Sequence, residues 1–530
     1  MGLSHLIKYV CALALLIAAP SVQAASSIGS ITINNGSIFD LEDPAEDKAL
    51  YRFANRAHIT TRPEVIEAQL LFEIGDKFSP QALAESERLL RANRYLHDAS
   101  IRPVLVADGT VDIEVTTTDV WTLIPKLDIS RSGGKNKSAF GIKEMNLLGT
   151  GIAVELQRKS DVDRDSTSLR LINKNIGRSR YAISTRLASN SDGHNVYLQL
   201  GKPFYSLDSR DAIGLTFRND NQVESFYDRG ERLSDFRRES GQLDLQKGWS
   251  KGLHNGWTKR LTVGLAYDDQ TFSAVTDPEY PSLLIPENRS LIYPYVGVEW
   301  LQDRYEKTSN HEQINITEDR FLGTRINGRL GLASADAGSD RDAWIMQAAA
   351  QTGFGDSKTS SLLLAANFNS RVEAGDFRNL TLGLSAKYYR RQSERRLFYI
   401  NLAATYGQEL DVDQQLLLGG DTGLRGYPLR YQAGDKQALL TIEQRFFTNW
   451  YPFRLFHVGG AVFFDAGRAW GDASLTSSKN DWLKDVGFGL RLGQTRSGQG
   501  RMTHIDVAFP LDGDQDIANV QFLVSTRKSF

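Results

Sequence analysis

A two-residue alternation of apolar and other side chains dominates this 530-residue chain from about Val120 onward. The gaps between the alternating segments are rich in Gly, Asn, Asp and Ser. Successive side chains of a strand point to opposite faces, so the pattern predicts antiparallel strands with one apolar and one polar face. Clear examples are Leu261-Val263-Leu265-Tyr267, Phe398-Ile400-Leu402-Ala404-Tyr406 and Ile505-Val507-Phe509.

The residues between the apolar positions distinguish a membrane barrel from a soluble β-protein. Many are Gly, Ala, Ser, Thr, Asn or Gln, with some charges, which suits a crowded polar lumen. Aromatic pairs near the predicted strand ends fit interfacial girdles; they include Phe204-Tyr205, Tyr388-Tyr389, Phe446-Phe447 and Trp450-Tyr451. We therefore predict an all-β transmembrane antiparallel β-barrel over residues 119–530. A large secreted β-sandwich or propeller is the alternative.

The predicted strands number about 20, of which about 15 precede Arg425 and about five follow it. Hairpins that stand outside the membrane would inflate this number, so we expect roughly 16 to 20 strands in the barrel. An even number is expected if both ends of the barrel sheet lie on the same side of the membrane.

Residues 1–24 have the pattern of a secretory signal peptide. Lys8 precedes a short apolar run over residues 10–19, and Val22-Gln23-Ala24 offers a small-residue cleavage site. The single cysteine of the chain, Cys11, lies in this run. The mature chain is therefore expected to contain no disulfide.

Residues 25–118 predict a small α+β domain. Apolar residues at positions 28, 31 and 33 indicate a strand, and residues 45–58 and 63–72 indicate helices. Ser79-Pro80 supplies an N-cap and a first-turn proline for a third helix, over about residues 81–93. Residues 101–106 and 111–115 then alternate about a Gly-containing turn and predict a hairpin.

Composition and motifs argue against several classes of function. The formal net charge is −2 and the basic residues are scattered, so no nucleic acid is expected as a partner. None of the eight histidines lies in a metal or hydrolase motif, so we expect no enzyme activity, no cofactor and no metal. The alternatives are a lipase built from His504 and a nearby serine, and a cation site in the acidic stretch at residues 161–165.

Four short motifs resemble those of the BamA/TamA superfamily, the bacterial surface antigen barrels that include two-partner secretion transporters. Leu424-Arg425-Gly426-Tyr427 resembles the [VL]-R-G-[FY] loop signature, and Phe463-Phe464-Asp465-Ala466-Gly467 resembles the F-x-D-x-G strand signature. Residues 146–151 (NLLGTG) resemble the early turn of these barrels, and residues 486–491 (VGFGLR) resemble their G-x-G-[LI]-R strand. Residues 25–118 resemble one POTRA domain, particularly at Ile74-Gly75-Asp76.

The loop signature predicts a site inside the barrel. Alternation turns Asp465 and Glu443 toward the lumen, where the five-donor guanidinium of an inward-folded loop arginine could reach both. The resemblance implies that Arg425 is held in this way by Asp465, with Glu443 close by. Gly426, Tyr427, Phe463 and Gly467 complete this predicted lock, and an exposed loop arginine is the alternative.

Two further surfaces are predicted for polypeptide partners. Phe522, Val524 and Phe530 share one face of the last strand and resemble the C-terminal signal of outer-membrane barrels, although Lys528 departs from it. The polar residues 525–529 predict a weakly held seam with the first strand, which the resemblance implies is a lateral gate; ordinary closure is the alternative. In the N-terminal domain, Ile101, Val104 and Val106 mark a docking edge, because Pro103 favours an edge strand.

The resemblance implies an outer-membrane protein of a Gram-negative bacterium with its POTRA domain in the periplasm. Its expected function is insertion, assembly or translocation of client polypeptides, which engage the POTRA domain and the barrel seam while lipids surround the barrel. A single POTRA domain favours an accessory or specialised transporter. A further periplasmic or inner-membrane partner is left open, and the alternative function is a passive channel for small solutes.

Overall fold

The computed structural model describes residues 27–106, 109–277, 279–472, 475, 481–498, 502–515, 517–527 and 529. The predicted signal peptide, residues 1–24, and the terminal Phe530 lie outside the described residues.

The N-terminal domain is a three-stranded sheet covered by short helices. Its elements are β1 (Ile28–Gly36), α2 (Ala49–Ala57), α3 (Pro63–Glu67), α4 (Pro80–Arg91), β2 (Leu96–Leu105) and β3 (Val111–Asp119). The strand order is β1-β3-β2, with β1 parallel and β2 antiparallel to β3. α4 begins as predicted: the Ser79 hydroxyl accepts a hydrogen bond from the Ala82 amide at 3.3 Å. Of the described helices, none is long and apolar enough to cross a membrane.

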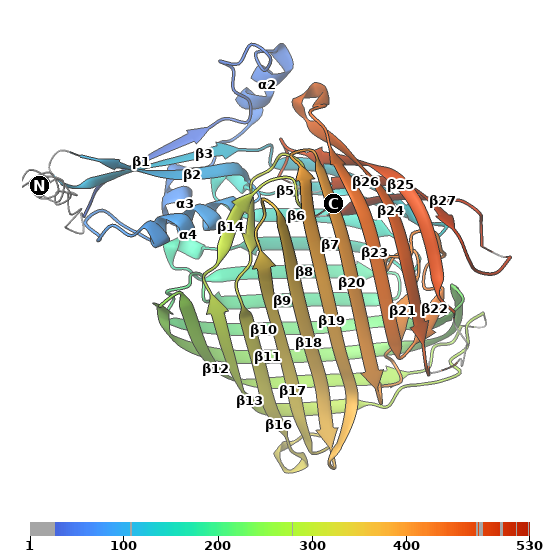
Figure 1. Ribbon diagram of the computed structural model, residues 1–530. Helices are drawn as coiled ribbons and strands as arrows, with labels where there is room; N and C mark the ends of the chain where they lie inside the picture. Colours follow the sequence, from blue (N-terminus) through green and yellow to red (C-terminus); the bar gives the residue numbers. More distant parts are fainter. Residues whose placement is uncertain are drawn as a thin grey trace, which may run out of the picture.

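The rest of the chain closes into one antiparallel barrel (Figure 1). In the described residues it has 20 strands, 15 before the Arg425 loop and five after it, as predicted, so the β-sandwich or propeller alternative is wrong. The strands are β4 (Leu123–Ser132), β5 (Lys135–Glu144), β6 (Ala153–Ser160), β7 (Asp165–Asn173), β8 (Ala182–Asn190), β9 (Gly193–Lys202), β10 (Asp211–Asp228), β11 (Glu231–His254), β12 (Trp257–Ser273), β13 (Arg289–Gln302), β16 (Arg325–Ala333), β17 (Ala343–Gly355), β18 (Ser360–Glu373), β19 (Asp376–Ser393), β20 (Arg396–Gln408), β23 (Lys436–Phe447), β24 (Phe456–Trp470), β25 (Leu483–Gln494), β26 (Met502–Pro510) and β27 (Gln521–Arg527).

The barrel has an apolar outside and a charged inside. Alternate residues of its strands expose large apolar side chains, for example Leu261, Val263 and Leu265 on β12 and Val486, Phe488 and Leu490 on β25. Buried charged side chains face the lumen; they include Glu443, Arg445, Asp465, Arg491 and Asp506. This distribution is the reverse of that in a soluble protein and fits a wall surrounded by lipid. The barrel is therefore a transmembrane barrel.

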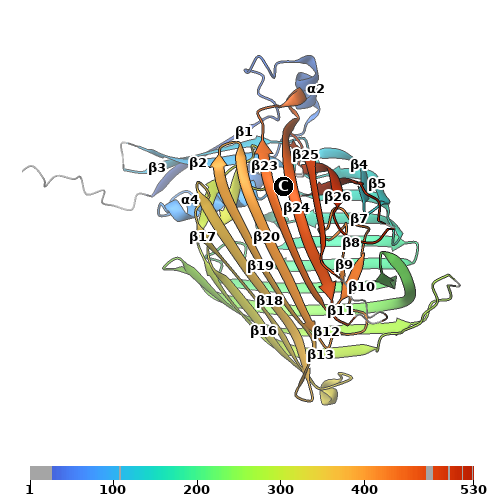
Figure 2. The ribbon, with the colours of Figure 1, turned by 45° about the vertical axis from the view of Figure 1, so that its right-hand side comes forward.

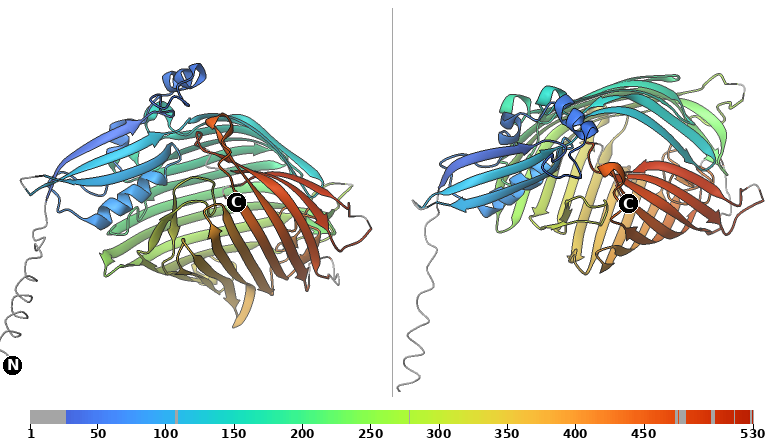
Figure 3. Two further views of the ribbon diagram at one scale, coloured as in Figure 1. Left: turned by 45° about the horizontal axis from the view of Figure 1, so that its top comes forward. Right: turned by 90° about the horizontal axis from the view of Figure 1, so that it is seen from above.

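The N-terminal domain lies against one end of the barrel, which we call the domain end; the opposite end is the loop end (Figures 1 and 3). The wall of β16 to β26 is best seen in Figure 2. Two small hairpins stand outside the barrel sheet: β14 (Tyr305–Thr308) with β15 (Glu318–Phe321), and β21 (Leu416–Leu418) with β22 (Gln432–Gly434). Single 3-10 turns η1 (Leu147–Gly149), η2 (Ile176–Arg178), η3 (Ala335–Ala337) and η4 (Pro452–Arg454) lie in strand connections.

A buried polar cluster joins the domain to the first turn of the barrel. The Asp119 carboxylate, at the end of β3, accepts hydrogen bonds from the amide and the hydroxyl of Thr61 at 2.7 and 2.8 Å. Asn146, in the turn after β5, donates to the Thr61 hydroxyl at 2.7 Å and accepts from the Gly151 amide at 2.6 Å. The NLLGTG motif therefore has a structural role in this chain, because its asparagine connects the turn to the domain.

Candidate functional site

The connection between β20 and β23, residues 409–435, folds back into the barrel and carries Arg425 into the lumen. Arg425 is 3% exposed. Its Nε and Nη2 donate to the two carboxylate oxygens of Asp465 on β24 at 2.6 and 2.9 Å, and its Nη1 donates to Glu443 on β23 at 2.9 Å. The guanidinium also lies over the ring of Phe463, 3.4 Å from its centroid. Paired, charge-assisted hydrogen bonds of this kind fix both the position and the orientation of the side chain.

Glycines near Arg425 lie where a larger residue would not fit or would strain the backbone. The Gly426 amide donates to Asp485 on β25 at 3.0 Å, and a Cβ at Gly426 would lie 2.7 Å from the Asp485 Cβ. Gly423 has a φ of 127°, which favours glycine. Gly467 on β24 lies beneath the loop: a Cβ there would lie 3.0 Å from the Leu418 side chain.

Tyr427 anchors the other side of the loop. Its hydroxyl donates to the Lys484 carbonyl at 2.7 Å and accepts from the Lys484 amide at 3.1 Å. Burial raises the pKa of Tyr427 to about 12, so the hydroxyl stays neutral and remains a donor. The loop is thus held by side-chain and backbone contacts to β23, β24 and β25.

The lock belongs to a larger buried ion-pair network. Glu443 also accepts a hydrogen bond from Arg445 Nε at 2.9 Å, and Arg491 pairs with Asp506 on the neighbouring wall. All of these side chains are buried. Removal of one partner from such a network leaves an uncompensated charge, which costs about 3 to 5 kcal/mol where water is scarce.

The loop is also tied to the rim at the loop end. Arg430 donates to both oxygens of Asp163, in the β6–β7 turn, at 2.8 and 2.7 Å, and it stacks over Tyr227. Burial opposes ionisation of the Asp163 carboxyl, but its interactions with Arg430 outweigh that effect, so its pKa lies below the ordinary value.

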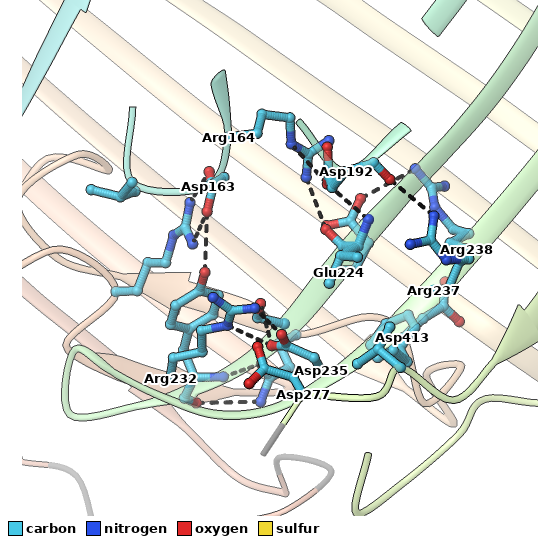
Figure 4. Close-up of a pocket in the computed structure, with 18 of the residues that line it drawn as sticks. Asp163, Arg164, Asp192, Glu224, Arg232, Asp235, Arg237, Arg238, Asp277 and Asp413 are labelled. Atoms are coloured by element: carbon cyan, nitrogen blue, oxygen red, sulfur yellow. Dashed lines mark hydrogen bonds and ion pairs between the residues drawn. The ribbon is translucent and has the colours of Figure 1, made fainter. Parts of the chain in front are cut away.

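Beside this contact is a charged cavity of about 810 Å³ (Figure 4). Acidic and basic side chains alternate around it, with Arg164 and Asp192 from the β6–β7 and β8–β9 turns and Glu224, Arg237 and Arg238 from β10 and β11. Charges of both signs make this cavity hydrophilic without selecting for an anion or a cation.

The seam between β27 and β4 is the weakest junction in the barrel sheet. In the described residues it has one registered pair, Val524 with Arg131, whereas β26–β27 has seven and β4–β5 has ten. Toward the domain end, a cavity of about 350 Å³ opens beside β4, lined by Trp121, Leu127, Thr503 and Thr526 among others. Phe522 is 61% exposed on the outer face and Val524 is half-buried.

The Arg425 loop crosses this seam at the loop end. On the β4 side, the Ser132 hydroxyl donates to the Gly420 carbonyl at 2.8 Å, and Gly133 packs so closely that a Cβ there would lie 2.2 Å from the Leu429 amide nitrogen. On the other side, Tyr431 donates to Asp514, in the β26–β27 connection, at 3.0 Å. The Arg425 loop therefore contacts the end of β4 on one side of the seam and the β26–β27 connection on the other.

β1 forms one edge of the N-terminal sheet, and β2 forms the other. Val104 and Val106 are 42% and 37% exposed there, whereas Ile101 is 7% exposed and packs in the domain core. Ile101 therefore cannot present its side chain to a partner, because the same alternation that exposes Val104 turns it inward.

No protein-family model and no curated protein matches this sequence. Among solved structures, CdiB from Acinetobacter baumannii is similar, with 12% identity, a TM-score of 0.46 and coverage of 96% of this chain and 74% of that chain. CdiB from Escherichia coli is similar with 13% identity, a TM-score of 0.40 and coverage of 97% of this chain and 92% of that chain. BamA from Haemophilus ducreyi lacking POTRA domains 1-3 is similar with 12% identity, a TM-score of 0.38 and coverage of 95% of this chain and 85% of that chain.

The structure also places the residues of the metal and lipase alternatives. No group of three or more His, Asp or Glu in the described part of the chain is placed to hold a metal ion. His504, the residue of the lipase alternative, contacts the backbone carbonyl of Ser529 at 2.9 Å. The sequence did not single out Asp485 or Arg445, although alternation places both on lumen-facing positions of their strands.

Proposed function

We propose that this chain is an outer-membrane assembly factor or transporter of a Gram-negative bacterium that inserts, assembles or translocates client polypeptides. The N-terminal domain stands in the periplasm as a single POTRA domain, and residues 119–530 form the membrane barrel. Arg425, Gly426, Tyr427, Glu443, Phe463, Asp465 and Gly467 lock the loop in the lumen. No catalytic group or cofactor is needed for this function.

The observation that carries the proposal is the seam with its single registered pair. A strand edge with unpaired backbone groups can be extended by an incoming strand, whose main chain supplies the missing hydrogen bonds. The cavity beside β4 leaves the domain-end half of that strand open to such an exchange. The exposed β2 edge offers a second strand-pairing site on the same side of the barrel.

A passive channel for small solutes is less well supported. The Arg425 loop occupies the lumen from the loop end, and a second segment enters it from the domain end through Ile314, which is fully buried against wall residues. A channel should give a large, steady conductance in planar bilayers, whereas a plugged transporter should give small, intermittent openings.

A disulfide across the seam tests the proposal. Arg131→Cys with Val524→Cys joins a registered pair, whose spacing suits a disulfide, in a mature chain without other cysteines. In cells depleted of the native protein, the oxidised pair should fail to restore the outer-membrane and secreted protein inventories, and a reductant should restore them.

The matched control is Arg131→Cys with Asn136→Cys, which joins β4 to its other, well-paired neighbour β5. This variant should support a normal inventory when oxidised. Normal client handling by the seam-locked protein would overturn the proposal.

A further inference from the structure

The β14–β15 hairpin enters the lumen at the domain end. It lies within residues 303–324, between β13 and β16, whereas neighbouring connections at this end, such as residues 255–256 and 394–395, are tight turns. Ile314, near its tip, is fully buried and packs with the lumen-facing Tyr389, Leu397, Tyr399, Phe447, Ala461 and Met502. The hairpin therefore occupies the mouth of the barrel on the side of the N-terminal domain.

The tip of the hairpin is a preformed unit. The Glu318 carboxylate accepts hydrogen bonds from the backbone amides of His311, Glu312 and Gln313 at 3.0, 3.0 and 3.2 Å. Three converging amides hold the turn closed by contacts within the hairpin itself, as in other backbone anion nests. These contacts fix the conformation of the tip from within the hairpin.

The wall holds this tip through contacts to side chains, among them His311 and Glu312, and through contacts to backbone carbonyls. Arg391 on β19 donates to the Ser309 carbonyl at 2.7 Å and to the Asn310 carbonyl at 3.2 Å, and Arg445 on β23 donates to the His311 carbonyl at 2.9 Å. Carbonyl oxygens are present in every polypeptide. The carbonyl contacts of the two guanidiniums therefore do not depend on the side chains of the occupant.

The N-terminal domain holds the other end of the hairpin. Arg91, in the last turn of α4, donates through Nε and Nη2 to both oxygens of Asp319 on β15 at 2.8 and 2.6 Å. Thr317 donates to Asp98 on β2 at 3.0 Å, and Lys307 pairs with Glu87 on α4. Figure 1 shows β14 beside α4 and β2. Any displacement of the domain from the barrel must break these contacts or move the hairpin.

We propose that the β14–β15 hairpin is a resident plug. The N-terminal domain holds it in a cradle formed by Arg391 and Arg445, and this cradle binds the backbone of an extended client segment when the hairpin has left. The plug is connected to the Arg425 lock, because Arg445 holds His311 with one nitrogen and Glu443 with another. Withdrawal of the hairpin therefore removes the His311 contact of Arg445, a residue that also binds the carboxylate holding Arg425. This inference rests on the proposed polypeptide-handling function.

Conductance of the purified full chain in planar bilayers tests the plug. A variant with residues 303–324 replaced by a short Gly-Ser linker should show larger and longer openings than the wild type. A synthetic peptide with capped termini and without charged side chains should then reduce this conductance when added at the domain end. Arg391→Gln in the linker variant should raise the half-blocking concentration about tenfold, as expected for loss of a charge-assisted contact.

Arg378→Gln is the matched control for the cradle, because Arg378 lies on the same strand and pairs with the exposed Glu409 at the loop end. It should leave the block unchanged. Equal block of the linker variant with and without Arg391→Gln would overturn the cradle, and a wild-type conductance of the linker variant would overturn the plug. Heat-modifiable migration in gels establishes that each variant is a folded barrel.

The tether to the domain is tested in the intact protein. Asp319→Asn should increase the frequency of openings, and Asp319→Glu should return it toward the wild-type value. Glu67→Gln breaks a different domain–barrel ion pair, the exposed contact with Arg178, and should change nothing. The seam disulfide should leave the lumen conductance unaffected, so failure of this inference is distinguishable from failure of the proposed function.

Discussion

Glu443 binds Arg425 with one carboxylate oxygen and Arg445 with the other. Arg425 comes from the loop end, whereas Arg445 holds the segment that enters from the domain end. A single residue on the inner wall therefore contributes to both closures of the lumen. Asp465, in contrast, binds Arg425 through both of its carboxylate oxygens.

Asp465→Asn should release the loop while leaving the barrel inserted. The change removes the charge that pairs with Arg425, and a buried guanidinium with a missing partner should weaken the lock by about 3 kcal/mol, or less if water enters. Trypsin added at the loop end of reconstituted protein should then cleave the loop faster. Asp165→Asn is the control, since its pair with Arg158 is long and exposed, and it should not alter cleavage.

Part of this site was predictable from the sequence. Period-2 alternation fixes which residues of β23 and β24 face inward, and the loop signature supplied Arg425 by resemblance. The contact of Arg445 with His311 was not predictable, because it is made to a backbone carbonyl more than 100 residues earlier in the chain. Asp485 was missed for a similar reason: its contact is to a backbone amide, which leaves no mark in the sequence.

At the scale of elements, the loop of residues 409–435 and the β14–β15 hairpin enter the lumen from opposite ends. Both are irregular segments held by arginines, and both contain strands of only three or four residues. Strands this short produce no alternation that a sequence pattern could reveal. The loop was found through its motif, and the hairpin was not expected.

The rim contact of the loop should survive mild acid. The folded-state pKa of Asp163 is lowered by Arg430, so the contact stabilises the loop above the ordinary aspartate value of 3.8 and is lost as pH falls below it. The mobility of a spin label attached at the exposed position of Asp421 should therefore be constant from neutral pH down to about pH 4 and rise below that. Asp163→Asn should give the higher mobility at every pH; a rise below about pH 4 in that variant like that of the wild type would contradict the assignment.

At the scale of the whole molecule, the structure has two strand edges on the same side: β2 of the N-terminal domain and the domain-end half of β4. The sequence predicted the 20 strands because each hairpin is local. It could not give the register of the seam, which depends on strands at opposite ends of the chain.

Charges on the β2 edge should impair client handling without unfolding the domain. Val104→Lys with Val106→Lys places two ammonium groups on exposed positions, where edge lysines discourage strand pairing. The outer-membrane protein inventory should fall toward that of depleted cells, while the circular dichroism of the purified protein stays unchanged. Leu41→Lys, at a partly exposed position outside the sheet, should restore a normal inventory.

The pairing of residue 131 with residue 524 also constrains how this protein is made. Neighbouring hairpins can form as soon as their two strands exist, but the sheet cannot become a cylinder until almost the entire chain has been exported. Until then, β4 lacks β27 as its second neighbour, and the apolar outer face of the sheet is not yet surrounded by lipid. The newborn chain therefore passes through a stage in which an unpaired strand edge and an apolar surface are both open to association with other chains.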